Sequence, residues 1–195
     1  NICYTCHDLA KIAFSIIRKP NARNWSAYNF QKENGNLSYE EFLSKNSNFQ
    51  VKVLTKGQKY KTEELVNEIF YNFQLGILER FDESMVLFEW LFEKIGINLD
   101  FSYSNNFNSQ NYGKKNITNT LDHHEVDQKM NEFFKLDNLL YDKANKKLDE
   151  ELEKLTNLEK KLSDFKMRCE KLKKINYLGK RKSYGQGPQS FFYMQ

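Results

Sequence analysis

Apolar positions in this chain follow two periods, and these predict strands alternating with helices. The segment 10–17 is a short apolar run rich in β-branched residues, typical of a strand buried in a parallel sheet. Pro20 stops this run, because proline cannot donate to a strand ladder. The segment 73–78 is a second apolar run and predicts a second strand. This alternation indicates an α/β domain with a parallel sheet.

Helices are expected around these strands, over 24–31, 39–45, 61–72 and 84–95. Ser38 precedes Glu41 by three positions, which is a capping box and predicts a helix start at residue 39. Asp82 and Ser84 are expected to cap the last of these helices. We also expect Glu79 to pair with Arg80 or Arg23. Only two strands are convincing, so we interpret the sheet as incomplete, with its N-terminal part before residue 1.

The C-terminal part is predicted to be helical from residue 122 to about 174, after an irregular surface loop over 98–120. Apolar residues recur there at every seventh position: Leu148, Leu155, Leu162 and Cys169. A long amphipathic helix packed on its own domain is favoured over a coiled-coil partner, and both remain open. The expected organisation is 1–142 as the C-terminal part of the domain, 143–176 as the long helix and 177–195 as a basic tail.

Composition supports a globular core with a polar surface, with 39% hydrophobic and 29% charged residues. Sixteen Phe and eleven Tyr supply large apolar area for that core. The net charge of +4 is a mild bias toward anionic ligands and does not indicate a nucleic-acid partner. No apolar run reaches the 18 residues of a membrane span. Three cysteines are too few for a disulfide scaffold.

The segment 14–28 carries the most specific chemistry. It reads as a strand, then Arg18, then Pro20, then a helix that bears Ser26 eight positions after the arginine. A turn from strand to helix binds anions well, because free N–H groups and the positive helix end point at the ligand. Arginine adds a fork of donors that fits a phosphate, and serine adds a hydroxyl.

This segment resembles the 3′-phosphate-binding motif R-x-P-x-x-x-x-x-S of sulfotransferases that use 3′-phosphoadenosine 5′-phosphosulfate (PAPS). The segment 75–87 (LGILERFDESMVL) is similar to the E-x-F-D-E-S-L-V-L-L stretch of galactose 3-O-sulfotransferases, the galactosylceramide sulfotransferase-like family. The segment 136–145 (LDNLLYDKAN) is similar to another of their stretches. The resemblance implies a P-loop-like parallel sheet flanked by helices, in which Arg18 and Ser26 bind the 3′-phosphate of PAPS.

The same resemblance makes His7 the candidate catalytic base, which would remove the proton of the attacking sugar hydroxyl. The alternative for His7 is a capping or core histidine. The family implies a glycan or glycolipid acceptor, a galactose hydroxyl above all, no metal, and a place on the lumenal side of the Golgi membrane. Membrane anchoring and the loop for the 5′-phosphosulfate are expected before residue 1, so the 195 residues alone are expected to be inactive.

Two other classes of function remain open. The chain could be a catalytically dead sulfotransferase-like protein that binds partners through the helix 143–174. A nucleotide kinase-like protein shares the phosphate-site logic, but it needs acidic magnesium ligands, and none stands out. The oligomeric state is open, with a homo-oligomer as one option.

Overall fold

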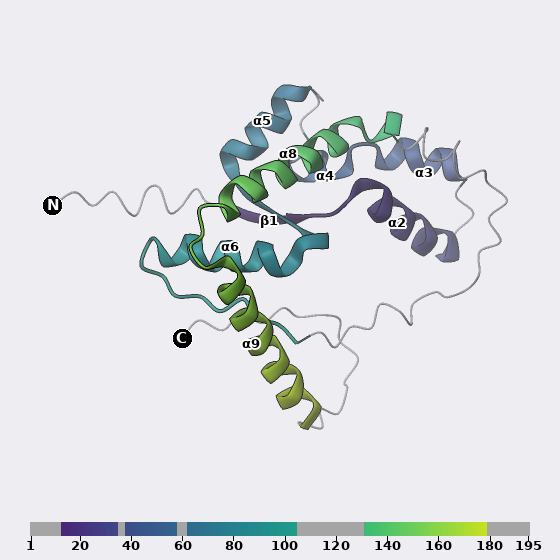
Figure 1. The fold of residues 1–195 in the computed structure, drawn as a ribbon. Coiled ribbons are helices and arrows are strands. Elements are labelled where there is room, and N and C mark those ends of the chain that lie inside the picture. The colour runs from purple at the N-terminus through teal and green to yellow at the C-terminus, as the bar shows by residue number, and fades with distance from the viewer. Residues whose placement is uncertain (1–12, 35–37, 58–61, 105–130, 179–195) are drawn as a thin grey trace. The chain divides into compact units, whose positions relative to one another are not determined.

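The computed structural model describes residues 13–34, 38–57, 62–104 and 131–178 (Figure 1). The elements in chain order are β1 (Ala13–Ile17), α2 (Pro20–Asn34), α3 (Tyr39–Asn46), α4 (Phe49–Leu54), α5 (Glu63–Asn72), β2 (Phe73–Ile77), the 3-10 turn η1 (Leu78–Arg80), α6 (Phe81–Glu93), α8 (Lys135–Leu152) and α9 (Leu158–Leu178). The chain forms two compact units, Asn1–Phe81 with Thr118–Glu150 and Asp82–Ile117 with Glu151–Gln195.

The first unit contains a two-stranded parallel sheet flanked by helices. Strands β1 and β2 pair in register from Ala13 opposite Phe73 to Ile17 opposite Ile77. Ile17 and Ile77 are almost fully buried, as expected for apolar runs in a parallel sheet. The two predicted strands and their parallel arrangement are therefore confirmed, and the described residues are otherwise mostly helical.

Helix α2 follows β1 after two residues and begins earlier than the sequence pattern predicted (Figure 1). Pro20 is its first residue, where a fixed φ suits a helix and a missing N–H removes no intrahelical bond. The buried side chain of Asn24 donates to the carbonyl of Pro20 at 2.8 Å and so reinforces this first turn. Proline therefore ends the strand and also starts the helix.

Helix α3 begins where the capping box predicted. The N–H of Glu41 donates to Oγ of Ser38 at 3.2 Å, and Oε2 of Glu41 accepts from the N–H of Ser38 at 3.0 Å. The next predicted helix, α5, starts at Glu63 behind Thr62, whose side chain makes no capping hydrogen bond. Both helices are confirmed within two residues of their predicted bounds.

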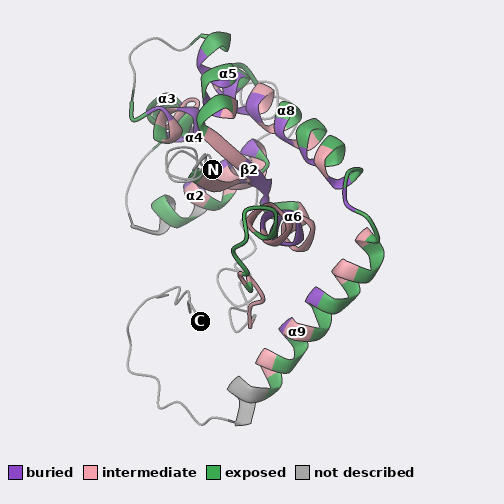
Figure 2. Ribbon diagram, turned by 90° about the vertical axis from the view of Figure 1, so that its left-hand side faces the viewer, coloured by how far each residue is buried: buried purple, intermediate pink, exposed green. Residues whose placement is uncertain are grey.

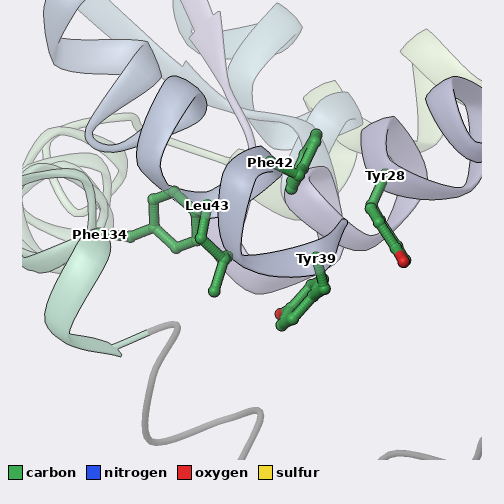
Figure 3. Packing of buried hydrophobic residues seen from close by; sticks show 5 residues of the cluster. All are labelled: Tyr28, Tyr39, Phe42, Leu43 and Phe134. Carbon is green, nitrogen blue, oxygen red and sulfur yellow. The ribbon is translucent and has the colours of Figure 1, made fainter. Parts of the chain in front are cut away.

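An aromatic cluster joins α2 to α3 (Figure 3). It consists of buried side chains from these two helices and from the residue just before α8: Tyr28, Tyr39, Phe42, Leu43 and Phe134. The rings of Tyr28 and Tyr39 meet edge to face with centroids 5.0 Å apart, and those of Tyr28 and Phe42 lie 5.3 Å apart. Such pairs stabilise beyond the area they bury. The cluster therefore fixes the position of α2, which leads away from the sheet.

Helix α8 presents an apolar stripe to the first unit. Leu136, Leu140, Ala144 and Leu148 recur every fourth residue and are all at most 6% exposed. Figure 2 shows buried positions along one side of α8 and exposed positions along the other. The spacing of a helix face thus predicts which residues of α8 are buried.

The second unit contains nearly all of α6 and all of α9. Helix α6 begins at Phe81, so Asp82 and Ser84 lie inside its first turn instead of before it, and the expectation that they cap a helix starting at residue 84 is wrong. Asp82 accepts a hydrogen bond from the hydroxyl of Tyr103 at 3.0 Å. Phe165 of α9 is fully buried, with its ring 6.2 Å from that of Tyr103. This burial within one chain agrees with a helix packed on its own domain.

The expected single helix over 143–176 is wrong. Helix α8 ends at Leu152 and α9 begins at Leu158, and Asn157 between them has a left-handed backbone with φ of 59°. The seven-residue spacing therefore does not run along one continuous helix. No helix in the described ranges is both long and apolar enough to span a membrane.

Candidate functional site

Arg18 is the first residue after strand β1, two positions before helix α2 begins. The last aligned pair of the sheet is Ile17 with Ile77, so Arg18 lies at the carboxyl edge of both strands. The first turn of α2 carries no acidic residue that would neutralise the positive end of its dipole. Anionic ligands bind at such strand-to-helix turns in open α/β sheets.

Gln50 holds the main chain of Arg18 on both sides. The N–H of Arg18 donates to Oε1 of Gln50 at 2.9 Å, and Nε2 of Gln50 donates to the carbonyl of Arg18 at 2.9 Å. Gln50 is only 8% exposed, so water competes little for these two bonds. The backbone from which the arginine side chain projects is therefore fixed by α4, a six-residue helix that the sequence pattern did not predict.

Helices α4 and α8 cap each other. Asp137 in the first turn of α8 accepts from the N–H groups of Gln50 at 3.2 Å and Val51 at 2.9 Å. Asn48, which precedes α4, accepts through Oδ1 from the N–H groups of Leu136 at 2.9 Å and Asp137 at 3.2 Å. These bonds satisfy donors that helix starts leave unpaired. They tie α4, and with it Gln50, to α8.

The buried carboxyl of Asp137 faces a positive neighbour. Burial raises the pKa of Asp137, and its two N–H donors and Arg23 oppose that rise. Burial in turn lowers the pKa of Arg23, with Asp137 opposing and the nearby Arg18 adding to the effect. The guanidinium of Arg23 lies 3.8 Å from the ring centroid of Phe49 and donates to Oδ1 of Asn24 at 2.9 Å. Arg23 is thus a positive charge fixed close to Arg18.

Glu79 stands just past the end of the neighbouring strand, and three groups surround its carboxylate. Its Oε1 accepts from the N–H of Lys19 at 3.0 Å and lies 4.0 Å from Nε of Arg18. Its Oε2 accepts from the hydroxyl of Tyr141 at 3.3 Å. Burial raises the pKa of Tyr141, which keeps this phenol a proton donor. Glu79 therefore joins the β1–α2 turn to α8.

The expected partner of Glu79 needs correction. We predicted Arg80 or Arg23, but the carboxylate of Glu79 faces Arg18. Arg80 is next in sequence, yet its Nη1 pairs with Oδ1 of Asp149 at 2.6 Å. The guanidinium of Arg23 already contacts Phe49 and Asn24. The register of the two strands decides the pairing, because it brings the ends of β1 and β2 together.

The structure places two of the three predicted site residues. Arg18 is half-exposed at the sheet edge, and Ser26 is exposed on α2. Within the described ranges, no hydrogen bond joins the two side chains, and the guanidinium of Arg18 faces Glu79. His7 lies outside the described residues.

Sequence reasoning missed the role of Gln50 in this site. It sits between Phe49 and Val51 with no motif around it, and its partner is 32 positions away. Asp137 and Tyr141 belong to the segment 136–145 singled out in the sequence, and both form hydrogen bonds in the structure. The signal for them was their spacing of four on one predicted helix.

Two hollows lie elsewhere in the described residues. One, of about 440 Å³ in the first unit, lies between α5, β2 and α8 and is lined by Phe70, Phe73 and Lys143 among others. The other, of about 550 Å³ in the second unit, is lined by Trp90 and Glu93 among others. Neither lining includes the two predicted phosphate ligands. In the described part of the chain, no three His, Cys, Asp or Glu residues are grouped so that they could hold a metal ion.

Comparison with known proteins gives no relative from which a role could be transferred: no protein-family model, curated protein or solved structure matches the chain.

Proposed function

We propose that this chain carries the 3′-phosphate site of a PAPS-dependent carbohydrate sulfotransferase, with β1 and β2 as two strands of a P-loop-like sheet. The observation that carries the proposal is the position of Arg18. Its side chain is 40% exposed at the carboxyl edge of a parallel strand pair, beside the start of α2. A guanidinium there can bind a phosphate through two parallel hydrogen bonds.

Two further groups support this role for the edge. Ser26 is exposed on α2 and has a hydroxyl that can donate a hydrogen bond. Arg23 adds a second positive charge near Arg18, and its contacts with Phe49 and Asn24 keep it in place. A phosphate at this edge would meet Arg18, the neighbouring Arg23 and the start of α2, and the proposal requires it to reach Ser26 six residues along that helix.

The proposed reaction moves a sulfuryl group to a sugar hydroxyl, preferably of galactose in a glycolipid or glycoprotein. The hydroxyl oxygen attacks the sulfur of PAPS, and the bond from sulfur to the bridging 5′-phosphate oxygen breaks. 3′-Phosphoadenosine 5′-phosphate (PAP) leaves, and His7 takes the hydroxyl proton. A histidine suits this step because its ordinary pKa lies near neutral pH. Arg18 and Ser26 bind the nucleotide and take no part in bond breaking.

Replacing Arg18 by alanine in the full-length protein tests the proposal. The loss of charged hydrogen bonds should weaken PAP binding about ten- to a hundredfold, as measured by isothermal titration calorimetry. Binding of ADP, which lacks the 3′-phosphate, should change little. Equal PAP affinity for the wild type and Arg18→Ala would contradict the assigned site.

Arg80→Ala is the matched control. Arg80 also lies at this end of the sheet, in the turn after β2, but its guanidinium pairs with Asp149. This variant removes the same charge from the same unit and should keep PAP affinity within about twofold, because the guanidinium of Arg80 is already paired with Asp149 and is not offered to the ligand. If Arg80→Ala weakens binding as much as Arg18→Ala, the effect is one of net charge and does not identify a phosphate ligand.

A further inference from the structure

The contact between Arg18 and Glu79 is loose. Nε of Arg18 and Oε1 of Glu79 are 4.0 Å apart, beyond hydrogen-bond range, and the two side chains are 40% and 36% exposed. Ion pairs of this kind add little to stability. Gln50 fixes the main chain of Arg18. The side chain of Arg18 can therefore move away from Glu79 without moving the β1–α2 turn.

Glu79, in contrast, is fixed through both carboxylate oxygens. Oε1 accepts from the main-chain N–H of Lys19 and Oε2 accepts from the hydroxyl of Tyr141. These donors come from the turn before α2 and from α8, and neither depends on Arg18. If Arg18 turns toward a ligand, the carboxylate stays behind as a stationary negative charge beside the site.

We propose that Glu79 is a competing internal anion. It attracts Arg18 when the nucleotide is absent, and it weakens the binding of the 3′-phosphate when the nucleotide is present. This inference rests on the proposed function. A phosphate bound to Arg18 takes over the arginine from Glu79 and is itself repelled by the carboxylate. PAP carries the same 3′-phosphate as PAPS, so a weaker grip also favours product release, a step that limits many enzymes.

Glu79→Gln tests the charge and keeps the shape. The amide oxygen can still accept from the N–H of Lys19, and the amide nitrogen can donate to the hydroxyl of Tyr141. PAP affinity of the full-length protein should rise about two- to fivefold. This gain should be smaller at high salt, because salt screens exposed charges. ADP, without a 3′-phosphate, should bind unchanged. Unchanged or weaker PAP binding would overturn the proposal.

Two comparisons separate competition for Arg18 from a general effect of charge. Glu68→Gln removes a negative charge from an exposed position on α5 of the same unit and should leave PAP affinity unchanged. In an Arg18→Ala background, Glu79→Gln should lose most of its gain, because no arginine remains to compete for. An equal gain in that background, or with Glu68→Gln, would overturn the proposal.

A measurement without nucleotide distinguishes failure of this inference from failure of the proposed function. Dicarbonyl reagents must reach the guanidinium of Arg18, and attraction to the carboxylate of Glu79 holds that side chain back from the reagent. Peptide mass spectrometry of the labelled protein should show about two- to fivefold faster modification of Arg18 in Glu79→Gln. Faster labelling without PAP binding in any variant would reject the sulfotransferase site and keep the Arg18–Glu79 competition. Unchanged labelling would overturn the competition itself.

Discussion

Arg18 in the first unit and Arg168 in the second both lie beside carboxylates, but they are bound in opposite ways. Arg168 donates from Nη1 and Nη2 to the two oxygens of Glu89 at 2.9 and 2.7 Å, and from Nε to Asp164 at 3.0 Å. It also pairs with Asp100. Arg18 has one carboxylate at 4.0 Å. Arg168 is therefore saturated with acceptors, whereas Arg18 still has donors to offer to a ligand.

The difference shows how one residue type serves two purposes. The hydrogen bonds to Glu89 raise the pKa of Arg168, so its side chain is part of the structure of its unit and stays charged. At Arg18 the main chain is fixed by Gln50, and the side chain is 40% exposed with a loose contact to Glu79. A fixed backbone with an unsaturated side chain is the arrangement that a ligand needs, because binding then requires little reordering.

The largest effect is expected from Arg168→Ala, which tests whether this arginine is structural. The substitution leaves Glu89, Asp164 and Asp100 close together without their common cation, and Glu89 is largely shielded from water. We expect the free energy of unfolding to fall by about 3 kcal/mol, as for other charged hydrogen-bond networks that lose one partner. Denaturant unfolding of the full chain, monitored by circular dichroism, measures this loss.

Lys173→Ala is the control for that substitution. Lys173 pairs with Glu170 at 2.6 Å on the same helix α9, but both side chains are well exposed. Its loss should leave the free energy of unfolding essentially unchanged. If Arg168→Ala costs equally little, the carboxylates around it do not depend on the arginine, and the contrast with Arg18 disappears.

An intermediate effect is expected from Asp137→Asn, which weakens the support of the Arg18 main chain. An asparagine oxygen can replace only part of the double cap on α4, so we expect a loss of about 1–2 kcal/mol near pH 4. The pKa of Asp137 is raised in the fold, chiefly by burial. Its carboxyl is therefore protonated more readily in the folded than in the unfolded chain, and its contribution to stability falls as pH rises above about 4.

The difference in stability between wild type and Asp137→Asn should consequently be largest near pH 4 and shrink toward pH 8. Denaturant unfolding at a series of pH values measures it. A difference that grows toward pH 8 would mean that the N–H donors of α4 and the charge of Arg23 outweigh burial, and that the pKa of Asp137 is lowered.

Sequence patterns predicted the elements whose signals are local. The capping box at Ser38 located α3, and continuous apolar runs located β1 and β2. Helix α4 was missed because it is only six residues long and its cap comes from Asp137, more than eighty positions away. The break before α9 was missed because heptad spacing continues through it, and a left-handed Asn157 leaves no trace in that spacing.

In the candidate site, too, local features could be predicted from the sequence and long-range contacts could not. Arg18 at a strand-to-helix turn could be predicted, because β1 and Pro20 mark the turn in the local sequence. Its contacts with Gln50 and Glu79 could not, since they join residues 32 and 61 positions apart and depend on the register of β1 with β2. Adjacent charges suggested Arg80 for Glu79, and tertiary structure overrode that suggestion.

The smallest effect is expected for the stability of Arg18→Ala. It tests whether Arg18, unlike Arg168, contributes little to the fold. A pair 4.0 Å apart with both side chains more than a third exposed should contribute no more than about 0.5 kcal/mol to unfolding. A double-mutant cycle of Arg18→Ala and Glu79→Gln, followed by denaturant unfolding, measures that coupling directly. A coupling above about 2 kcal/mol, the range of tightly bound charged groups, would make Arg18 a structural arginine like Arg168. An arginine with such a strong coupling to Glu79 could bind a phosphate only by destabilising the fold. The coupling free energy between Arg18 and Glu79 therefore decides whether Arg18 is available to a nucleotide.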